Sequence, residues 1–146
     1  MNICSLCKYF TIFVQNNNME SQERKDKAIT KQAKVVFKNL LNDHNTLFGG
    51  IALQWMDEVA YITATRFCKK KVVTVSTGKI DFLKPIPLGT IVELIGTVKN
   101  AGSVKLEINV QMFLEQKYSN EREKAVEGNF YFAAVNDDNA PVRLIE

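Results

Sequence analysis

The 146-residue sequence contains few of the residue types on which many protein sites depend. It has one histidine, one tryptophan, three prolines and three cysteines. A single histidine leaves little material for a metal centre, and an odd number of unevenly spaced cysteines argues against a disulfide framework. No apolar run approaches the length of a membrane span. We therefore expect no metal, no resident cofactor, no membrane partner and a reducing, cytoplasmic compartment.

The charge balance is also unremarkable, and it limits the classes of partner. Nineteen basic residues against sixteen acidic ones give a net charge of +3. That excess is too mild to predict nucleic-acid binding, although it would not repel an anionic ligand. With 46% hydrophobic content the chain can bury a proper core, and its length fits one domain.

The first residues raise two alternatives. Cys4 and Cys7 form a lone Cys-x-x-Cys, which could be half a zinc site or a redox pair, but only Cys68 and His44 remain as further ligands. We interpret them as free thiols in a tail. The apolar run of this tail could also be a signal peptide, but Lys8 interrupts it and no small-residue cleavage site follows.

The segment after this tail is charged and has almost no apolar content, which is typical of disorder. Met19 heads it, so we expect Met19 to be the natural start and residues 1–18 to be an upstream extension. The sequence therefore predicts a disordered extension over residues 1–30 and one folded domain over residues 31–146.

The folded part begins with one short strand and one long helix. Residues 33–41 are predicted to form a strand or strand-like segment, and the turn-prone residues 42–45 then end it. Residues 50–67 contain no proline and no glycine after the first position. They carry apolar residues on nearly all sides, which indicates a central helix surrounded by other structure.

The rest of the chain has the alternation of β-strands. Strands are predicted over residues 72–82, 90–99, 105–115 and 124–135, and the second and third of these should pair as a hairpin. A long buried helix needs a surface to cover it, and a curved antiparallel sheet does so economically. The fold class is therefore α+β, with a sheet of five to six strands around the helix.

The start of the long helix is the strongest candidate for a reactive site. Gly49 and Gly50 precede it directly, and the unpaired N–H groups of a helix N-terminus suit an oxygen that gains negative charge. Asp57 follows two turns later on an apolar stripe with Ala60, close enough to serve the same site, and burial would make it a better general base. Each residue also has a structural explanation, because glycines often flank helices and a helix aspartate can pair with a lysine or arginine.

Other catalytic arrangements have weaker support. Glu58 points to the more polar side of the helix and is expected to be solvated. His44 is the single histidine, so nucleophilic serine or cysteine chemistry would have to use it, but no Gly-x-Ser-x-Gly elbow is present. A phosphate-binding glycine loop is also absent from the sequence.

Several linked motifs resemble one known family. They are Asn42-x-x-x-Thr-Leu-Phe-Gly-Gly, Trp55-Met-Asp-Glu-Val-Ala, Val73-Thr-Val-Ser, and the run from Lys79 to Leu94 that begins Lys-Ile-Asp-Phe-Leu-Lys-Pro. In this order they are similar to the hotdog-fold acyl-CoA thioesterases of the YciA and brain acyl-CoA hydrolase type. The resemblance covers roughly residues 33–145. It implies a helix wrapped by a long antiparallel sheet, and protomers that pair sheet to sheet and assemble further into hexamers as trimers of dimers.

The resemblance also implies roles for individual residues. Asp57 would act as general base on water or as nucleophile, and the turn at Phe48, Gly49 and Gly50 would hold the carbonyl oxygen. Asn42 matches a catalytic asparagine, supplied to the site by the other chain of the dimer. Coenzyme A would be part of the substrate, so no separate cofactor is implied. The residues implied to contact the substrate are Phe48, Ser76 and Thr77, and Lys99 or Lys105 could contact the CoA phosphates where the hairpin departs from the family pattern.

Two departures from the family pattern leave alternatives open. Asn45 stands where the family usually has glycine, in the loop that presents Asn42, and Gly102-Ser-Val-Lys replaces the more usual hairpin sequence. A non-catalytic acyl-CoA-binding or regulatory protein is therefore one alternative. A hotdog enoyl-thioester hydratase is another, but that chemistry usually pairs a histidine with an acid on the helix, and this helix has no histidine.

Overall fold

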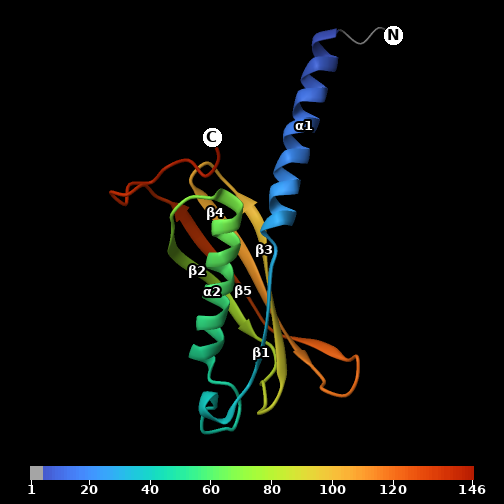
Figure 1. Ribbon diagram of the computed structural model, residues 1–146, viewed down its shortest axis with the longest axis vertical. Helices are drawn as coiled ribbons and strands as arrows, with labels where there is room; N and C mark the ends of the chain where they lie inside the picture. Colours follow the sequence, from blue (N-terminus) through green and yellow to red (C-terminus); the bar gives the residue numbers. More distant parts are fainter. Residues whose placement is uncertain (1–4) are drawn as a thin grey trace.

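The chain folds into one five-stranded antiparallel sheet with a long helix across one face (Figure 1). The computed structural model describes residues 5–146. The strands lie in the order β1-β3-β4-β5-β2, so the hairpin of β3 and β4 is central and β1 and β2 form the two edges. The elements in chain order are α1 Ser5–Ala28, β1 Thr30–Val35, the 3₁₀ turn η1 Lys38–Leu40, α2 Gly49–Cys68, β2 Val72–Phe82, β3 Ile91–Ala101, β4 Lys105–Glu115 and β5 Arg122–Ala134.

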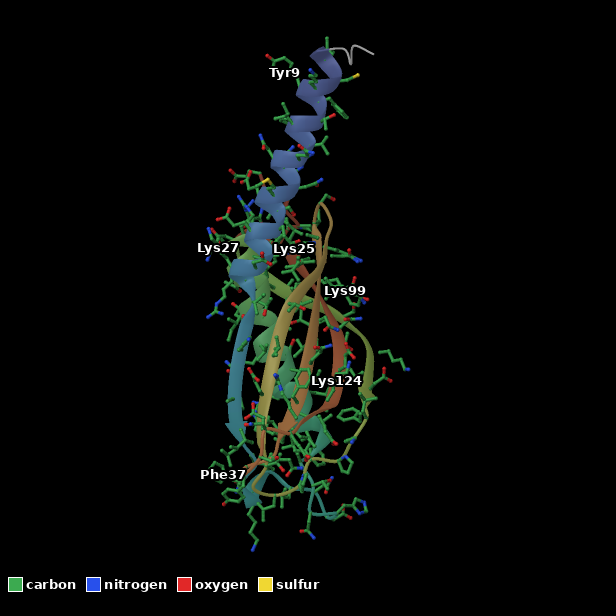
Figure 2. The ribbon with its side chains drawn as sticks, turned by 90° about the vertical axis from the view of Figure 1, so that its right-hand side faces the viewer. Tyr9, Lys25, Lys27, Phe37, Lys99 and Lys124 are labelled. Atoms are coloured by element: carbon green, nitrogen blue, oxygen red, sulfur yellow. The ribbon has the colours of Figure 1, made fainter. Side chains whose placement is uncertain are left out.

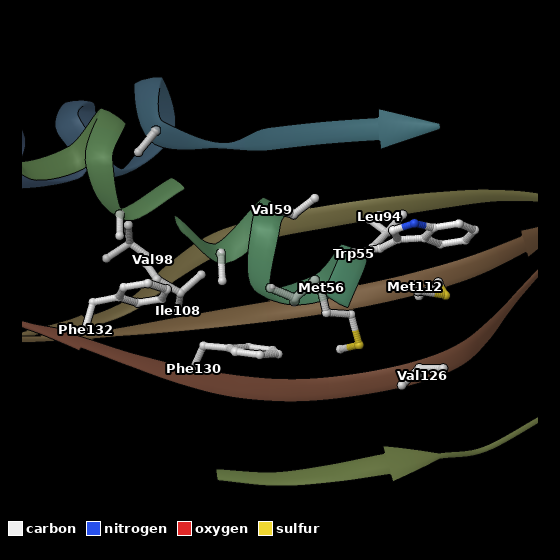
Figure 3. Packing of buried hydrophobic residues seen from close by; sticks show 14 of the residues in the cluster. Trp55, Met56, Val59, Leu94, Val98, Ile108, Met112, Val126, Phe130 and Phe132 are labelled. Carbon is white, nitrogen blue, oxygen red and sulfur yellow. The ribbon is translucent and has the colours of Figure 1, made fainter. Parts of the chain in front are cut away.

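The core lies between α2 and the concave face of the sheet. Trp55, Met56 and Val59 project from α2 towards side chains of the central strands, including Ile108 and Phe130 (Figure 3). These positions recur at helical spacing on α2 and at alternate positions on the strands, as a one-faced core requires. The opposite side of α2 is not covered, because Gln54, Glu58 and Tyr61 are exposed in the single chain.

The closest approach of α2 to the sheet depends on Gly96 in β3. A Cβ atom built at Gly96 would lie 2.4 Å from Oγ1 of Thr63 and 2.9 Å from Cγ1 of Val59. Thr63 is fully buried and its hydroxyl donates a hydrogen bond to the carbonyl of Val59 at 2.8 Å. Neither side chain is a flexible end that can swing away, so the helix lies against bare backbone at this point.

We expect Gly96→Ala to lower the free energy of unfolding by about 1–3 kcal/mol, the usual range for overpacking a filled core. Urea denaturation of the purified protein measures this change. Thr97→Ala is the matched control, because Thr97 is half-buried on the other face of the same strand, and it should cost much less. Equal effects of the two substitutions would contradict this account of the contact.

The N-terminal segment differs from the expectation of disorder. Residues 5–28 form the helix α1, which extends away from the sheet (Figures 1 and 2). No glycine or proline interrupts this segment, and side-chain pairs one turn apart support its charged half: Glu20 with Arg24 at 3.5 Å and Glu23 with Lys27 at 2.6 Å. Its last residues pack on α2 and β3, and Ala28 is fully buried. The structure thus describes residues 5–28 as a helix where the sequence predicts disorder, and the division of the chain at residue 30 stays a prediction.

Three further expectations concern the first strand, the N-terminal cysteines and membrane-spanning segments. The predicted strand at residues 33–41 lies instead at Thr30–Val35 and is followed by η1. Cys4 lies outside the described residues, so the prediction about the Cys4 and Cys7 pair is not addressed, while Cys7 is exposed and free. In the described part of the chain, no helix has the length and apolarity needed to cross a membrane.

Candidate functional site

The loop before α2 is held by the side chain of Asn42. Its Oδ1 accepts hydrogen bonds from the backbone N–H groups of His44 and Thr46 at 3.0 and 3.1 Å. Its Nδ2 donates to Oγ1 of Thr46 at 3.1 Å, which leaves its second N–H for another acceptor. Asn45 adopts a positive φ of 60°, a conformation that asparagine tolerates, so the residue that replaces glycine here still permits a tight turn.

The start of α2 presents free backbone donors next to this loop. Phe48 is the N-cap and makes no side-chain capping bond. The first bonds back to its carbonyl come from the N–H groups of Ile51 and Ala52, at 2.9 and 3.1 Å. The N–H groups of Gly49 and Gly50 precede the first intrahelical bonds and lie at the positive end of the helix dipole. They can therefore receive an oxygen that gains negative charge.

Asp57 lies further along α2 and faces the edge strand β2. It is half-buried, and its Oδ1 accepts a hydrogen bond from the Thr74 hydroxyl at 3.3 Å. No described lysine or arginine forms an ion pair with it. The structural explanation for a helix aspartate, an ion pair with a basic residue, is therefore absent from the described chain. The carboxylate remains accessible from the open side of α2.

Thr74 is the site residue that the sequence did not identify. Simple alternation would place Thr74 and Ser76 on the same face of β2, but a register irregularity between them interrupts the alternation. Thr77 then pairs with the buried Phe130 on the helix side, while Ser76 pairs with Tyr131. The Tyr131 hydroxyl bonds to Glu107 on the outer face, so Ser76 lies on the face away from Asp57. The spacing of β-branched residues alone could not reveal this irregularity.

The candidate residues form two separate groups within one chain. Asp57 is eight positions after Gly49 on α2, which corresponds to about 12 Å along the helix axis. A cavity is lined by Asn42 and Gly49 but not by Asp57 or Thr74. The described cavity therefore does not bring Asp57 and the glycine turn of the same helix together, and the expectation that the two serve one site stays a prediction.

The edge strand β2 lies beside both groups and has no partner on its outer side in the described chain. Its Val73 and Val75 are 38% and 49% exposed, and Phe82 at its end is 54% exposed. An edge strand with exposed apolar residues is a template for pairing with another chain. This edge is therefore the natural place for a second copy to complete the site.

The two lysines implied to bind CoA lie far from Asn42 in the same chain. Lys99 is at the end of β3 near α1, whereas Phe37, just before the Asn42 loop, is at the opposite end of the molecule (Figure 2). Lys99 pairs with Glu107 at 3.5 Å. A hydrogen bond from Asn100, with a smaller contribution from Lys99, holds the pKa of Glu107 below its usual value. Lys105 begins β4 at the same end and is exposed.

The described residues offer few side chains that could bind a metal ion together. Residues 5–146 contain no cluster of three or more histidine, cysteine, aspartate or glutamate side chains that could hold an ion. The His44 side chain is exposed, and its Nε2 lies 3.6 Å from Oδ1 of Asp43. The expectation of metal-free chemistry stays a prediction.

Comparison with known proteins identifies the family. The thioesterase superfamily matches residues 44–119, which include all of α2 and extend through β4. The chain belongs to the thioesterase superfamily. It is 35% identical to the acyl-CoA thioester hydrolase YkhA of Bacillus subtilis, a relative otherwise uncharacterized, over 84% of this chain and 71% of that protein. The family predicted from the sequence motifs is confirmed.

Solved structures of superfamily members share the fold. The acyl-CoA hydrolase of Staphylococcus aureus in complex with butyryl-CoA and CoA aligns with a TM-score of 0.79 at 33% identity, over 82% of this chain and 73% of that one. A hexameric acyl-CoA thioesterase without ligand aligns with a TM-score of 0.78 at 29% identity, over 84% of this chain and 80% of that one. The predicted hotdog fold is confirmed.

Three variants of the Staphylococcus aureus enzyme each replace one residue by alanine: an asparagine, an aspartate and a threonine. Along that chain the aspartate follows the asparagine by 15 positions and the threonine follows the aspartate by 17. Asn42, Asp57 and Thr74 are the same residue types at the same two spacings. The three residues of this chain therefore share both type and spacing with the three positions replaced in that enzyme.

Proposed function

We propose that this thioesterase-superfamily protein hydrolyses acyl-CoA thioesters to a carboxylic acid and free CoA. The observation that carries the proposal is the pair formed by Asp57 and the Thr74 hydroxyl on the open side of α2. The matched spacing of Asn42, Asp57 and Thr74 in a relative that binds butyryl-CoA supports it. The test is a thiol-release assay with acyl-CoA substrates of increasing chain length.

The reaction needs a base, an oriented water and a site for the carbonyl oxygen. Asp57 takes a proton from water while the water oxygen forms a bond to the thioester carbon. The carbonyl oxygen gains negative charge and is held by the N–H groups at the start of α2, Gly49 and Gly50, and by the free N–H of Asn42. The C–S bond then breaks, and CoA leaves as a thiolate that takes up a proton. Attack by the Asp57 carboxylate itself remains the alternative first step, with an anhydride that water then cleaves.

We further propose that two copies of the chain complete each site by antiparallel pairing of their β2 edges. The two β2 strands then run in opposite directions, so the start of one lies beside the end of the other. This pairing brings the Asn42 and Gly49 end of one chain towards Asp57 and Thr74 of its partner, which lie nearer the other end of β2. It also brings the Lys99 and Lys105 end of the partner to the Asn42 end, where those lysines can reach CoA phosphates. Assembly of such dimers into a hexamer extends the same proposal, and a hexameric relative supports it.

Two other functions fit the fold less well. A non-catalytic acyl-CoA-binding protein would need no aspartate and threonine pair beside the substrate, and its thiol-release rate would equal the uncatalysed rate. An enoyl-thioester hydratase would add water to a carbon–carbon double bond, which an absorbance assay with an enoyl-CoA detects. The absence of a histidine from α2 argues against the hydratase. Cytoplasmic location and the lack of a nucleic-acid partner stay predictions.

The contact between Thr74 and Asp57 gives a test of its own. We expect Thr74→Val to lower kcat about 10-fold, because the carboxylate keeps its chemistry but loses the hydroxyl that orients it, and loss of the base itself would cost about 100-fold or more. Thr74→Ser keeps the hydroxyl and should retain most of the rate. Steady-state kinetics of both variants give the two kcat values for comparison. If the serine variant is as slow as the valine variant, the hydroxyl has no positioning role.

A further inference from the structure

The loop, the first turn of α2 and the segment after β2 enclose a cavity of about 320 Å³. Asn42 and Gly49 lie on its lining, so it opens where the thioester carbonyl would be held. We infer that this cavity takes the acyl chain, and that it makes the enzyme selective for neutral aliphatic acyl groups over acyl groups with a terminal carboxylate. The inference rests on the proposed function, because it assigns the substrate of that same site.

The floor of the cavity is apolar and buried. Leu47, Ala52, Ile86 and Val126 line it, and they are 7%, 2%, 3% and 1% exposed. They come from the loop, α2, the segment after β2, and β5, so elements distant in sequence converge on one apolar space. Ala52 is the smallest of the four, and its side chain leaves room that a larger residue would fill. An alkyl chain can bury itself here without leaving a polar group unpaired.

The free N–H groups in the lining, those of Asn42 and Gly49, are the ones proposed to hold the thioester carbonyl oxygen, so they are not available to the end of the acyl chain. Asn42 and Thr46 bond to each other, and Lys84 is the one charged residue in the described lining. Lys84 forms an ion pair with Glu123 and is half-exposed, so it offers no free cation inside the cavity. A terminal carboxylate would lose its water without gaining a partner. The pantetheine arm of CoA has two amides and a hydroxyl, and these polar groups would also lose their water here without gaining hydrogen-bond partners.

The experiment compares hexanoyl-CoA with adipoyl-CoA, which has the same number of carbons and a terminal carboxylate. We expect kcat/KM for hexanoyl-CoA to exceed that for adipoyl-CoA by about 100-fold or more, because burial of an unpaired charge is costly. Ala52→Leu should lower the ratio of the hexanoyl-CoA rate to the acetyl-CoA rate about 10-fold or more, since extra carbons on the floor displace those of the substrate.

A second pair of variants does not disturb the buried floor. Phe82 lines the cavity and is 54% exposed in the single chain, at the end of the β2 edge proposed to pair, so gel filtration must first show that Phe82→Ala keeps the parental assembly; the variant should then raise the rate with longer chains relative to hexanoyl-CoA. Leu88 is equally exposed but lies outside this lining, and Leu88→Ala should leave the chain-length profile unchanged. Identical profiles for all variants would overturn the inference, even if hydrolysis itself is confirmed.

Binding of thioether analogues separates this inference from the proposed function. If the protein cleaves no acyl-CoA, hydrolysis is refuted, and calorimetry with hexyl-CoA thioether still tests the cavity. Tighter binding of hexyl-CoA thioether than of CoA, weakened by Ala52→Leu, would support the acyl assignment. Equal weakening of CoA and hexyl-CoA thioether by Ala52→Leu would instead place the pantetheine arm in the cavity and overturn it.

Discussion

Asp57→Asn is expected to lower kcat for acyl-CoA hydrolysis by about two orders of magnitude or more, the usual contribution of a positioned general base. The amide of asparagine has nearly the same shape but cannot take a proton from water or attack the carbonyl carbon. The amide oxygen can still accept the Thr74 hydrogen bond, so the local geometry should persist. Because the substitution removes chemistry and not contacts with substrate, the change should fall on kcat much more than on KM.

The neighbouring residue provides the control for this prediction. Glu58 is exposed, and its side chain accepts a hydrogen bond from Gln32 at 3.4 Å. Glu58→Gln makes the same chemical change one residue away, and it should leave kcat within about twofold of the parent, as most surface substitutions do. Thermal unfolding of both variants should stay close to that of the parent. Parental turnover by Asp57→Asn would remove this carboxylate from the mechanism.

The sequence predicted the regular elements of the domain closely because their patterns have one physical cause. The helix expected over residues 50–67 spans Gly49–Cys68, and the four later strands begin and end within two residues of their predicted bounds. In α2, β3, β4 and β5 one face is buried against a single core, so hydrophobic periodicity reports the structure directly. The same patterns predicted that Glu58 would be solvated, and it is exposed.

Features that depend on contacts between distant segments could not be predicted in this way. The helix α1 has no apolar face along its charged half, and its support comes from pairs one turn apart and from packing of its last residues on α2 and β3. The place of β2 at the edge of the sheet follows from the pairing of β5 with both β4 and β2. The irregularity after Thr74 then decides which hydroxyl meets Asp57.

The division of the site into halves follows from the straight course of α2. A helix advances about 1.5 Å per residue, so the donors at its first turn and a carboxylate two turns later cannot both contact one carbonyl group. Under the proposed pairing, motifs adjacent in sequence would serve different sites in space. If the β2 edges pair, each site takes Asp57 and Thr74 from one chain and Asn42 and the glycine turn from the other.

Mixing two inactive variants tests this arrangement directly. Asn42→Ala alone should lower kcat about 100-fold or more, as loss of an oxyanion donor does, and Asp57→Asn should do the same for lack of a base. In a mixed dimer carrying both variants, one site has both substitutions and the other has none. Mixed dimers isolated through two different affinity tags should therefore recover about half the parental rate, as expected for two equivalent sites related by twofold symmetry. Dimers of Asp57→Asn carrying both tags are the control and should stay inactive. If Asn42 and Asp57 of the same chain formed the site, every site in the mixed dimer would carry one substitution, and the rate would not rise above that of either variant alone.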